Sequence, residues 1–480
     1  MSKDVSLTEK QVECVKKERK PWVTWLVLCL SIVFYGVFTS IPIDGLDSVA
    51  QKALAYAIVI VVFLLFEIFP VAVTSVIAVV IPAPLGIISQ ADVFANFAIG
   101  PVFFVFGVFI LAIAFTKTGF GYRMSLYVSG LFGNKPNMVL LSYMLAAGLL
   151  SSVLADIPTA VIFGVLALEI LKDNGCMPGC SNFGRSMMIG IPVAATVGGL
   201  GTPAGGALNV LTISILKNLT GIDITFIQWT IVCFPFAALM LILCWLIISK
   251  VFPAEISEVK GLDKLVEKRQ ELGPMTIREK KYLAIFALMF ILWLTQNFHG
   301  MALWTVAVLG VSLFFLPGID ILSWKETRKE IDYEVPFLIG GTNVVAVALT
   351  TTGAANWIAE NTIGGISSGS VLLVLLVTAV VGVYGRYIIP SNTAMVAVLT
   401  PVVCLMSAQF NISPTIMALI ICFGAHVTTL LPFSDPVSLA TYDHGYWTLG
   451  DMLKPSVIYG TLWIPLSVFY LCAFSMLGLI

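Results

Sequence analysis

Long apolar stretches recur along the whole chain, and they limit how it can fold more than any other feature. Many exceed the roughly 18 residues that indicate a membrane-spanning helix, whereas barrel strands are short and alternating. Of the 480 residues, 59% are hydrophobic and 11% are charged, and a soluble chain of this composition would expose too much apolar surface. The sequence therefore predicts an all-α polytopic membrane protein. It excludes a soluble enzyme, a nucleic-acid-binding protein and a disordered scaffold.

Glycine, proline and charged residues divide the apolar sequence into about eleven predicted transmembrane helices. Two further apolar segments, 138–171 and 370–408, are interrupted by polar motifs at their centres. We expect both to be re-entrant hairpins, because a non-helical tip at membrane depth must face protein or water. The predicted spans are residues 22–40, 54–68, 70–89, 100–117, 187–216, 226–251, 281–298, 302–316, 335–352, 413–441 and 455–479.

The basic residues predict an orientation in the membrane. With a cytoplasmic N-terminus and hairpins that return to their side of entry, nearly all lysines and arginines fall on the cytoplasmic side. The exceptions are Lys52 and Lys217 on the external side and Arg386 inside the second hairpin. This distribution predicts a cytoplasmic N-terminus and an external C-terminus.

The order of span, hairpin and long broken span occurs twice, at 100–216 and at 335–441. An odd number of crossings separates the two copies, which predicts an inverted repeat, the layout of secondary transporters with a substrate site at the midplane. The predicted domains are a cytoplasmic segment (1–21), scaffold helices (22–99), a first repeat (100–225), scaffold helices with a solvated linker helix (226–334), a second repeat (335–454) and a C-terminal transmembrane helix (455–480).

Four polar breaks interrupt these repeats, at residues 155–160, 198–209, 390–394 and 426–438. An unwound helix frees carbonyl groups for a cation and N–H groups for an anion. Neutral Ser, Thr and Asn donors suit a carboxylate that must bind and then leave. Ionisable residues at membrane depth are candidates for function, and here they are Asp156, Arg386, His426 and Asp435.

Three of these ionisable residues also have a structural interpretation. Asp435 can cap a helix near Pro436, and His426 can be a hydrogen-bonded interior histidine. Arg386 can extend to the outer membrane surface.

The ordered set of motifs resembles the divalent anion/sodium symporter (DASS) family. Ser391-Asn392-Thr393 is similar to the family's Ser-Asn-Thr hairpin signature, and the breaks at 198–209 and 431–438 resemble its two broken helices. The resemblance implies a homodimeric, elevator-type carrier of small dicarboxylate anions in the plasma membrane. It implies a substrate site formed by Pro158, Thr159, Thr202, Gly206, Asn209, Ser391, Asn392, Thr393, Pro436 and Ser438, and a cation or coupling site formed by Asp156, Gly199, Thr428 and Asp435.

The chain departs from the family pattern at both cation sites. Ile157 and Pro158 replace Ser and Asn in the first hairpin, unless the register shifts by two residues and brings Asp156 into the motif. Asp435 stands where the second broken helix of the family has Thr. These departures predict an exchanger. The expected substrates are malate, fumarate, succinate or 2-oxoglutarate, with no cofactor, no assigned metal and Na⁺ binding left open.

Three alternatives to an exchanger stay open. The first is a Na⁺- or H⁺-coupled dicarboxylate or citrate symporter, in which Asp156 or Asp435 binds the ion. The second is an intramembrane enzyme that uses these two aspartates as a catalytic pair. The third is a channel, which would not show saturable counterflow.

Overall fold

The structure, a computed structural model, describes residues 21–66, 68–128, 132–154, 156–355, 357, 370–387, 389, 391–427 and 436–478. Every regular element in these ranges is a helix, which confirms the predicted all-α class. The elements are α2 (Pro21–Ser40), α3 (Ser48–Leu65), α4 (Val71–Val80), α5 (Gln90–Phe97), α6 (Gly100–Thr118), α7 (Phe120–Val128), α8 (Pro136–Ser151), α9 (Asp156–Asp173), α10 (Asn182–Gly199), η1 (Pro203–Gly205), α11 (Ala207–Thr220), α12 (Phe226–Val251), α13 (Leu262–Glu271), α14 (Ile277–Leu294), α15 (Gln296–His299), α16 (Leu303–Ser312), η2 (Leu313–Phe315), α17 (Trp324–Glu330), α18 (Glu334–Thr351), α20 (Val371–Tyr384), η4 (Gly385–Tyr387), α21 (Asn392–Ser407), η5 (Ala408–Phe410), α22 (Pro414–Ala425), α23 (Pro436–Tyr442) and α24 (Leu449–Met476).

Fewer helices than expected are long enough to cross a bilayer unaided. Among the described residues, six stretches have the length and apolar composition for a span: Ser48–Leu65, Gln90–Thr118, Phe226–Val251, Glu334–Thr351, Asn392–Phe410 and Leu449–Met476. Many of the other predicted spans correspond to shorter apolar helices of 10–17 residues. The count of about eleven spans is therefore not confirmed.

The predicted span at 70–89 shows one reason for the difference. Its helix, α4, ends at Val80. Pro82 and Pro84 follow immediately, and proline has no amide hydrogen with which to continue a helix. The prolines thus end the helix, although the apolar sequence continues beyond it.

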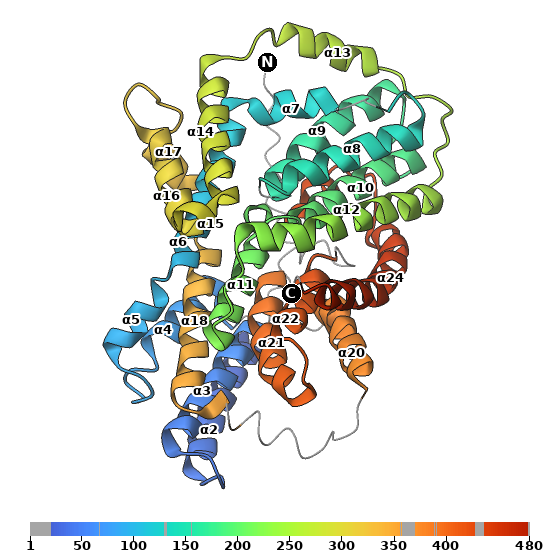
Figure 1. The fold of residues 1–480 in the computed structure, drawn as a ribbon. Coiled ribbons are helices and arrows are strands. Elements are labelled where there is room, and N and C mark those ends of the chain that lie inside the picture. Colours follow the sequence, from blue (N-terminus) through green and yellow to red (C-terminus); the bar gives the residue numbers. More distant parts are fainter. Residues whose placement is uncertain are drawn as a thin grey trace.

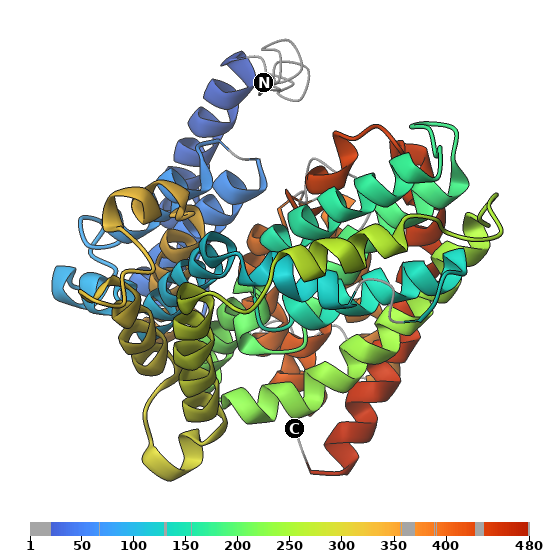
Figure 2. The same ribbon diagram turned by 90° about the horizontal axis from the view of Figure 1, so that it is seen from above.

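The helices pack in two groups, which Figure 2 shows side by side. In one group α10 packs against α8, α9 and α12, and α22 packs against α20, α21 and α24. In the other, α18 packs against α4, α5 and α6, and α16 packs against α6 and α14. Helix α11 connects the groups, because it contacts α21 and α22 as well as α18 and α6. The break between α10 and α11 therefore lies where the two groups meet (Figure 1).

The same sequence of elements occurs twice in the first group. Helices α8 and α9 precede the broken pair α10 and α11, as α20 and α21 precede α22 and α23. In each case the first hairpin helix packs closely on the first half of the broken helix. A Cβ atom on Gly198 of α10 would lie 2.1 Å from the carbonyl oxygen of Gly148, and one on Gly424 of α22 would lie 2.3 Å from the carbonyl carbon of Gly382. Small residues allow this approach of helix backbones in membranes.

We expect Gly198→Ala to destabilise the protein by about 2 kcal/mol, because overpacking a tight contact typically costs ~1–3 kcal/mol and a backbone atom cannot move as a side chain can. Thermal unfolding of the purified protein in detergent would measure the change. Gly36→Ala is the control, since that helical position has nothing within 4 Å of an added Cβ. Equal melting temperatures for the two variants would contradict the prediction.

The charged segment between α12 and α14 contains the expected linker helix, α13, which Figure 1 shows at one end of the molecule near α7 and α9. Two ion pairs fasten it to α9: Lys264 lies 2.7 Å from Asp173, and Lys268 lies 2.5 Å from Glu169. The linker helix therefore packs against the C-terminal end of α9, and Asp156 lies at the N-terminal end of the same helix.

The carboxylate of Glu255, between α12 and α13, holds the start of α10. Its Oε2 accepts a hydrogen bond of 2.8 Å from the Phe183 amide, and Oε1 accepts one from the Ser181 hydroxyl. Burial raises the pKa of Glu255, but these hydrogen bonds outweigh it, so the pKa lies below its usual value. The linker is thus connected to both α9 and α10.

Candidate functional site

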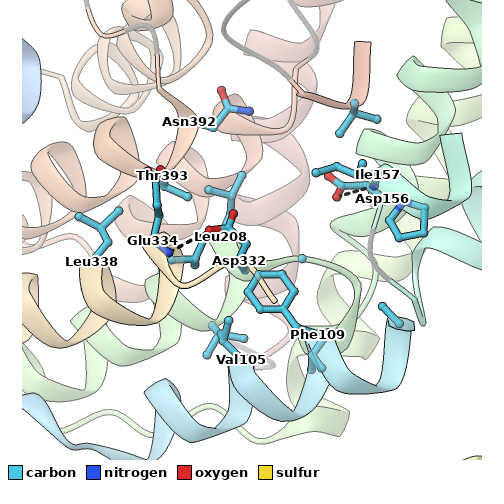
Figure 3. Close-up of a pocket in the computed structure, with 18 of the residues that line it drawn as sticks. Val105, Phe109, Asp156, Ile157, Leu208, Asp332, Glu334, Leu338, Asn392 and Thr393 are labelled. Carbon is cyan, nitrogen blue, oxygen red and sulfur yellow. Dashed lines mark hydrogen bonds between the residues drawn. The ribbon is translucent and has the colours of Figure 1, made fainter. Parts of the chain in front are cut away.

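A cavity of about 620 Å³ lies where the hairpins, the broken helices and α6 meet (Figure 3). This volume is within the range of roughly 300–1,000 Å³ that is usual for small-molecule sites. Helix α6 contributes an apolar wall that includes Val105, Val108 and Phe109, and α18 contributes Val335 and Leu338. The polar side chains of the lining come from α6, α9, α21, the end of α22 and the segment around the start of α18: Thr116, Asp156, Ser391, Asn392, Thr393, His426, Glu330, Asp332 and Glu334.

The tip of the second hairpin contributes Ser391, Asn392 and Thr393 to this lining. Ser391 caps α21: its Oγ accepts a hydrogen bond of 3.3 Å from the Ala394 amide and lies 3.0 Å from Oγ1 of Thr393. Serine is a preferred N-cap because its side chain satisfies a backbone amide that lacks a helical partner. The Oδ1 atom of Asn392 is buried and has no hydrogen-bond partner among the described residues. The predicted Ser-Asn-Thr group therefore faces the cavity together.

The first hairpin has its non-helical turn at residues 152–154, before most of the predicted motif at 155–160, because α8 ends at Ser151. Helix α9 begins at Asp156, so Pro158 and Thr159 lie in its first turn. Proline is tolerated there, because the first amides of a helix have no helical acceptor. Asp156, Ile157 and Pro158 line the cavity, whereas Thr159 is fully buried and is not part of the lining. The helical turn has directed Thr159 away from the position that the family resemblance implies.

Asp156 occupies the N-terminus of α9 with its own negative charge. Its Oδ1 accepts a hydrogen bond of 3.0 Å from the Ile157 amide. The N-terminal end of a helix carries a partial positive charge that favours an anion. In Figure 3 Asp156 lies across the cavity from Thr393. The two hairpin tips are therefore chemically unlike, one anionic and one neutral.

Of the four predicted site residues in the first broken helix, one lines the cavity and the other three are buried in the protein. Gly206 lines the cavity, while Gly199, Thr202 and Asn209 are buried. The Asn209 amide donates hydrogen bonds of 2.8 Å to the Gly199 carbonyl and 2.7 Å to the Thr202 carbonyl, and the Thr202 hydroxyl donates to the Ser152 carbonyl. These three residues hold the unwound turn in shape.

The second broken helix ends its first half at Ala425, and its second half begins at Pro436. Thr428 and Asp435 lie outside the described residues, and only the backbone of Pro436 is described. Ser438 is buried and is not part of the cavity lining. His426 is 2% exposed and lines the cavity.

Arg386 lies inside the protein and does not extend to an outer surface. It is 2% exposed, and its Nη1 donates a hydrogen bond of 2.8 Å to the carbonyl of Val427. The single turn η4 thereby connects the second hairpin to the end of α22. Arg386 is not among the residues that line the cavity.

Three further carboxylates, Glu330, Asp332 and Glu334, line the cavity and were not predicted from the sequence. Oδ1 of Asp332 accepts a hydrogen bond of 2.8 Å from the Glu334 amide at the start of α18, and Glu330 pairs with Lys117 at 2.7 Å. Acidic residues directly before an apolar helix are a known start signal. That signal would have predicted the start of α18. It would not have predicted that the start of α18 lies near the hairpins.

The electrostatic balance of the cavity is negative. Its described lining contains these three carboxylates and Asp156, and no lysine or arginine. Within the described part of the chain, no group of three or more His, Cys, Asp or Glu side chains could hold a metal ion. A bound anion would therefore rely on neutral donors and on helix N-termini, as in transporters with broken helices.

Most of the chain is similar in sequence to known membrane transporters. The family model for the sodium:sulfate symporter transmembrane region matches residues 22–478. The sodium-dependent dicarboxylate transporter SdcS of Staphylococcus saprophyticus is 28% identical over 436 residues, which are 85% of this chain and 83% of the relative. SdcS of Staphylococcus aureus strain MRSA252 is 27% identical over 472 residues, 91% of this chain and 88% of the relative.

Two solved transporter structures share the fold. The YdaH transporter of Alcanivorax borkumensis aligns with a TM-score of 0.53 and 14% identity, covering 80% of this chain and 87% of its own. MtrF of Neisseria gonorrhoeae, described with a class of antimetabolite efflux pumps, aligns with a TM-score of 0.56 and 13% identity, covering 96% of each chain. At these identities the likeness concerns the fold alone.

Proposed function

Because the chain belongs to the divalent anion/sodium symporter family, whose sodium:sulfate symporter model matches it from residue 22 to residue 478, we propose that it transports four- and five-carbon dicarboxylates. The family and the curated relatives are membrane transporters, which excludes the intramembrane enzyme. The relatives named sodium-dependent dicarboxylate transporters support this substrate class. The preferred substrates are malate, fumarate, succinate and 2-oxoglutarate.

The observation that carries the proposal is the cavity at the tip of the second hairpin. Ser391, Asn392 and Thr393 line it at the N-terminus of α21, and hydroxyl and amide groups there can donate to one carboxylate of a diacid. The N-terminus of α11, next to Gly206, also borders the cavity. These neutral donors favour reversible binding, which a carrier needs in order to release its substrate.

We propose that transport uses an elevator-type alternating-access movement between two inverted repeats of a homodimeric carrier. The hairpins and broken helices, α8–α11 and α20–α23, would move together. The two predicted repeats, which begin at residues 100 and 335, would place residues 100–118 and 335–351 in the mobile part. However, α6 packs on α16, and α18 packs on α4. We therefore assign α6 and α18 to the fixed scaffold. The plasma membrane as location, the cytoplasmic N-terminus and the external C-terminus stay predictions.

We propose exchange as the mode of transport. The first hairpin has Ile157 and Pro158 where the family has polar residues, and Asp156 brings a negative charge to the cavity. A carrier without sodium to reset its empty form needs a counter-substrate. The second candidate is cation-coupled symport, which the sodium-dependent relatives favour. In that case Asp156 or Asp435 would bind Na⁺ or carry a proton.

Uptake into reconstituted liposomes separates these modes. Labelled malate and 2-oxoglutarate would be offered to vesicles that are empty or preloaded with diacid, each with and without a sodium gradient. We expect uptake only into preloaded vesicles, with no dependence on sodium and with saturable counterflow. Sodium-driven uptake into empty vesicles would establish the symport alternative instead. The absence of diacid uptake under every condition would refute the proposed function.

Neutralising Asp156 gives a second, independent test of the mode. In an exchanger, Asp156→Asn removes a charge that repels the diacid, and two unit charges ~4 Å apart interact by about 1 kcal/mol even in bulk water. We therefore expect the KM for exchange to fall by about fivefold. Asp47→Asn is the control, because Asp47 caps α3 and does not line the cavity. A loss of sodium or proton dependence in Asp156→Asn would instead identify Asp156 as the coupling group.

A further inference from the structure

His426 is a cavity residue with no part in the substrate site argued so far. It follows the last residue of α22 and is 2% exposed, yet it lines the cavity beside the turn of the first broken helix. A buried polar side chain normally satisfies its hydrogen bonds within the protein. The hydrogen bonds of His426 show which of its two ring nitrogens has a partner within the protein.

The Nδ1 atom of His426 lies 2.8 Å from the carbonyl oxygen of Cys422, one helical turn earlier. A carbonyl oxygen only accepts hydrogen bonds, so Nδ1 carries the proton in this contact. The tautomer of a histidine is set by the hydrogen bond of its other nitrogen. In the neutral ring, Nε2 therefore has a free lone pair and acts as an acceptor.

Gly206 and His426 line the same cavity, and Gly206 lies beside Nε2. A Cβ atom on Gly206 would lie 3.6 Å from Nε2, and its next neighbours, Asn209 Nδ2 and the Gly199 carbonyl oxygen, would each lie 3.8 Å away. The φ angle of Gly206 is −162°, an extended conformation that any residue can adopt. The backbone therefore does not require glycine here, and the missing side chain keeps the face of Nε2 open.

The surroundings favour an uncharged ring. The guanidinium of Arg386 donates to the carbonyl of Val427, the residue next to His426. A second buried cation beside it would be costly without a paired anion. Asp156, Asp332 and Glu334 also line the cavity, but ionised carboxylates have no proton to give to Nε2. A group that binds Nε2 must therefore be a hydrogen-bond donor, and a hydroxyl group of the substrate is one.

We propose that Nε2 of His426 accepts a hydrogen bond from a hydroxyl group of the transported diacid, and so gives the carrier a preference for 2-hydroxy diacids over unsubstituted ones. The inference rests on the proposed function and adds a specificity-determining residue to it. One carboxylate would bind at the tip of α21, and the hydroxyl would face the turn between α10 and α11. A site that satisfies a buried acceptor discriminates against the analogue that lacks the donor.

Competition between L-malate and succinate tests the inference, because the two diacids differ by one hydroxyl group. The inhibition constants of both would be measured against labelled succinate in vesicles preloaded with succinate. In the unaltered protein we expect malate to bind more tightly. In His426→Leu the ratio of the two constants should shift by about fivefold towards succinate, the size of one net hydrogen bond. His426→Gln, whose amide oxygen can accept, should restore part of the preference.

Gly206→Ala provides a second variant in case His426→Leu does not fold. Its added methyl group would cover Nε2 at an ordinary contact distance, so the ratio should shift in the same direction. The control is His444→Leu, since His444 does not line the cavity. Size-exclusion chromatography and thermal unfolding would establish that each variant is folded.

Each outcome of this experiment has one meaning. Equal binding of malate and succinate by the unaltered protein would refute the inference, as would an unchanged ratio in folded His426→Leu and Gly206→Ala. An equal loss of affinity for both diacids in His426→Leu would refute it as well, because the ring would then be a charged ligand of a carboxylate. If neither diacid is exchanged by the unaltered protein, the proposed function fails first.

Discussion

Asn392→Ala should lower the rate of diacid exchange by about 100-fold while the protein stays folded. Asn392 is the first residue of α21 and lines the cavity, and its Oδ1 has no partner among the described residues. An amide oxygen only accepts, so the Nδ2 group of Asn392 is the one that would donate to a substrate carboxylate. A hydrogen bond to a charged group contributes about 1.5–3 kcal/mol, and the upper part of this range corresponds to about 100-fold.

The initial rate of labelled succinate exchange in preloaded vesicles, measured over a range of concentrations, checks this prediction. Asn137→Ala is the matched control, because Asn137 is an exposed residue in the first turn of α8 and does not line the cavity. Thermal unfolding should give the same melting temperature for both variants. Exchange by Asn392→Ala at the unaltered rate would remove Asn392 from the substrate site.

Arg386→Leu should lower the free energy of unfolding by about 3 kcal/mol, because a buried hydrogen bond from a charged group is worth up to ~3 kcal/mol. The side chain is 2% exposed and donates to the Val427 carbonyl. Without it, η4 loses its connection to the end of α22, and His426 beside Val427 loses a fixed neighbour. Reduced exchange should accompany the loss of stability.

Thermal unfolding and the yield of monodisperse protein would measure the effect of Arg386→Leu. Arg328→Leu is the control, since Arg328 is exposed on α17. Arg386→Lys should recover only part of the stability, because lysine keeps the charge but lacks the planar set of donors. A stability of Arg386→Leu within about 0.5 kcal/mol of the unaltered protein, as for ordinary surface changes, would contradict the buried role.

The sequence predicted two of the helix breaks, at 198–209 and 390–394, because their causes are local. Ser391 is a favourable N-cap, and it does cap α21. The glycines and the proline of the first broken helix separate α10 from α11 within the predicted range 198–209. The prediction was less successful within the first hairpin, where Thr159 was expected at the substrate site and is buried away from the cavity. A sequence motif indicates which residues form a turn, but the rotation of the helix determines which of their side chains face the cavity.

By itself, the sequence determined the membrane class, the all-α fold, the breaks at 198–209 and 390–394, and the family. Hydrophobicity and the preferences of Gly, Pro and Ser act over a few residues. Only the tertiary structure decided which polar groups share the cavity. Glu334, Asn392 and Asp156 come from α18, α21 and α9, and the packing of helices distant in the chain brings them together. The open face of His426 likewise depends on Gly206, a residue in the other repeat. Such proximity arises from helix packing, which no local pattern encodes.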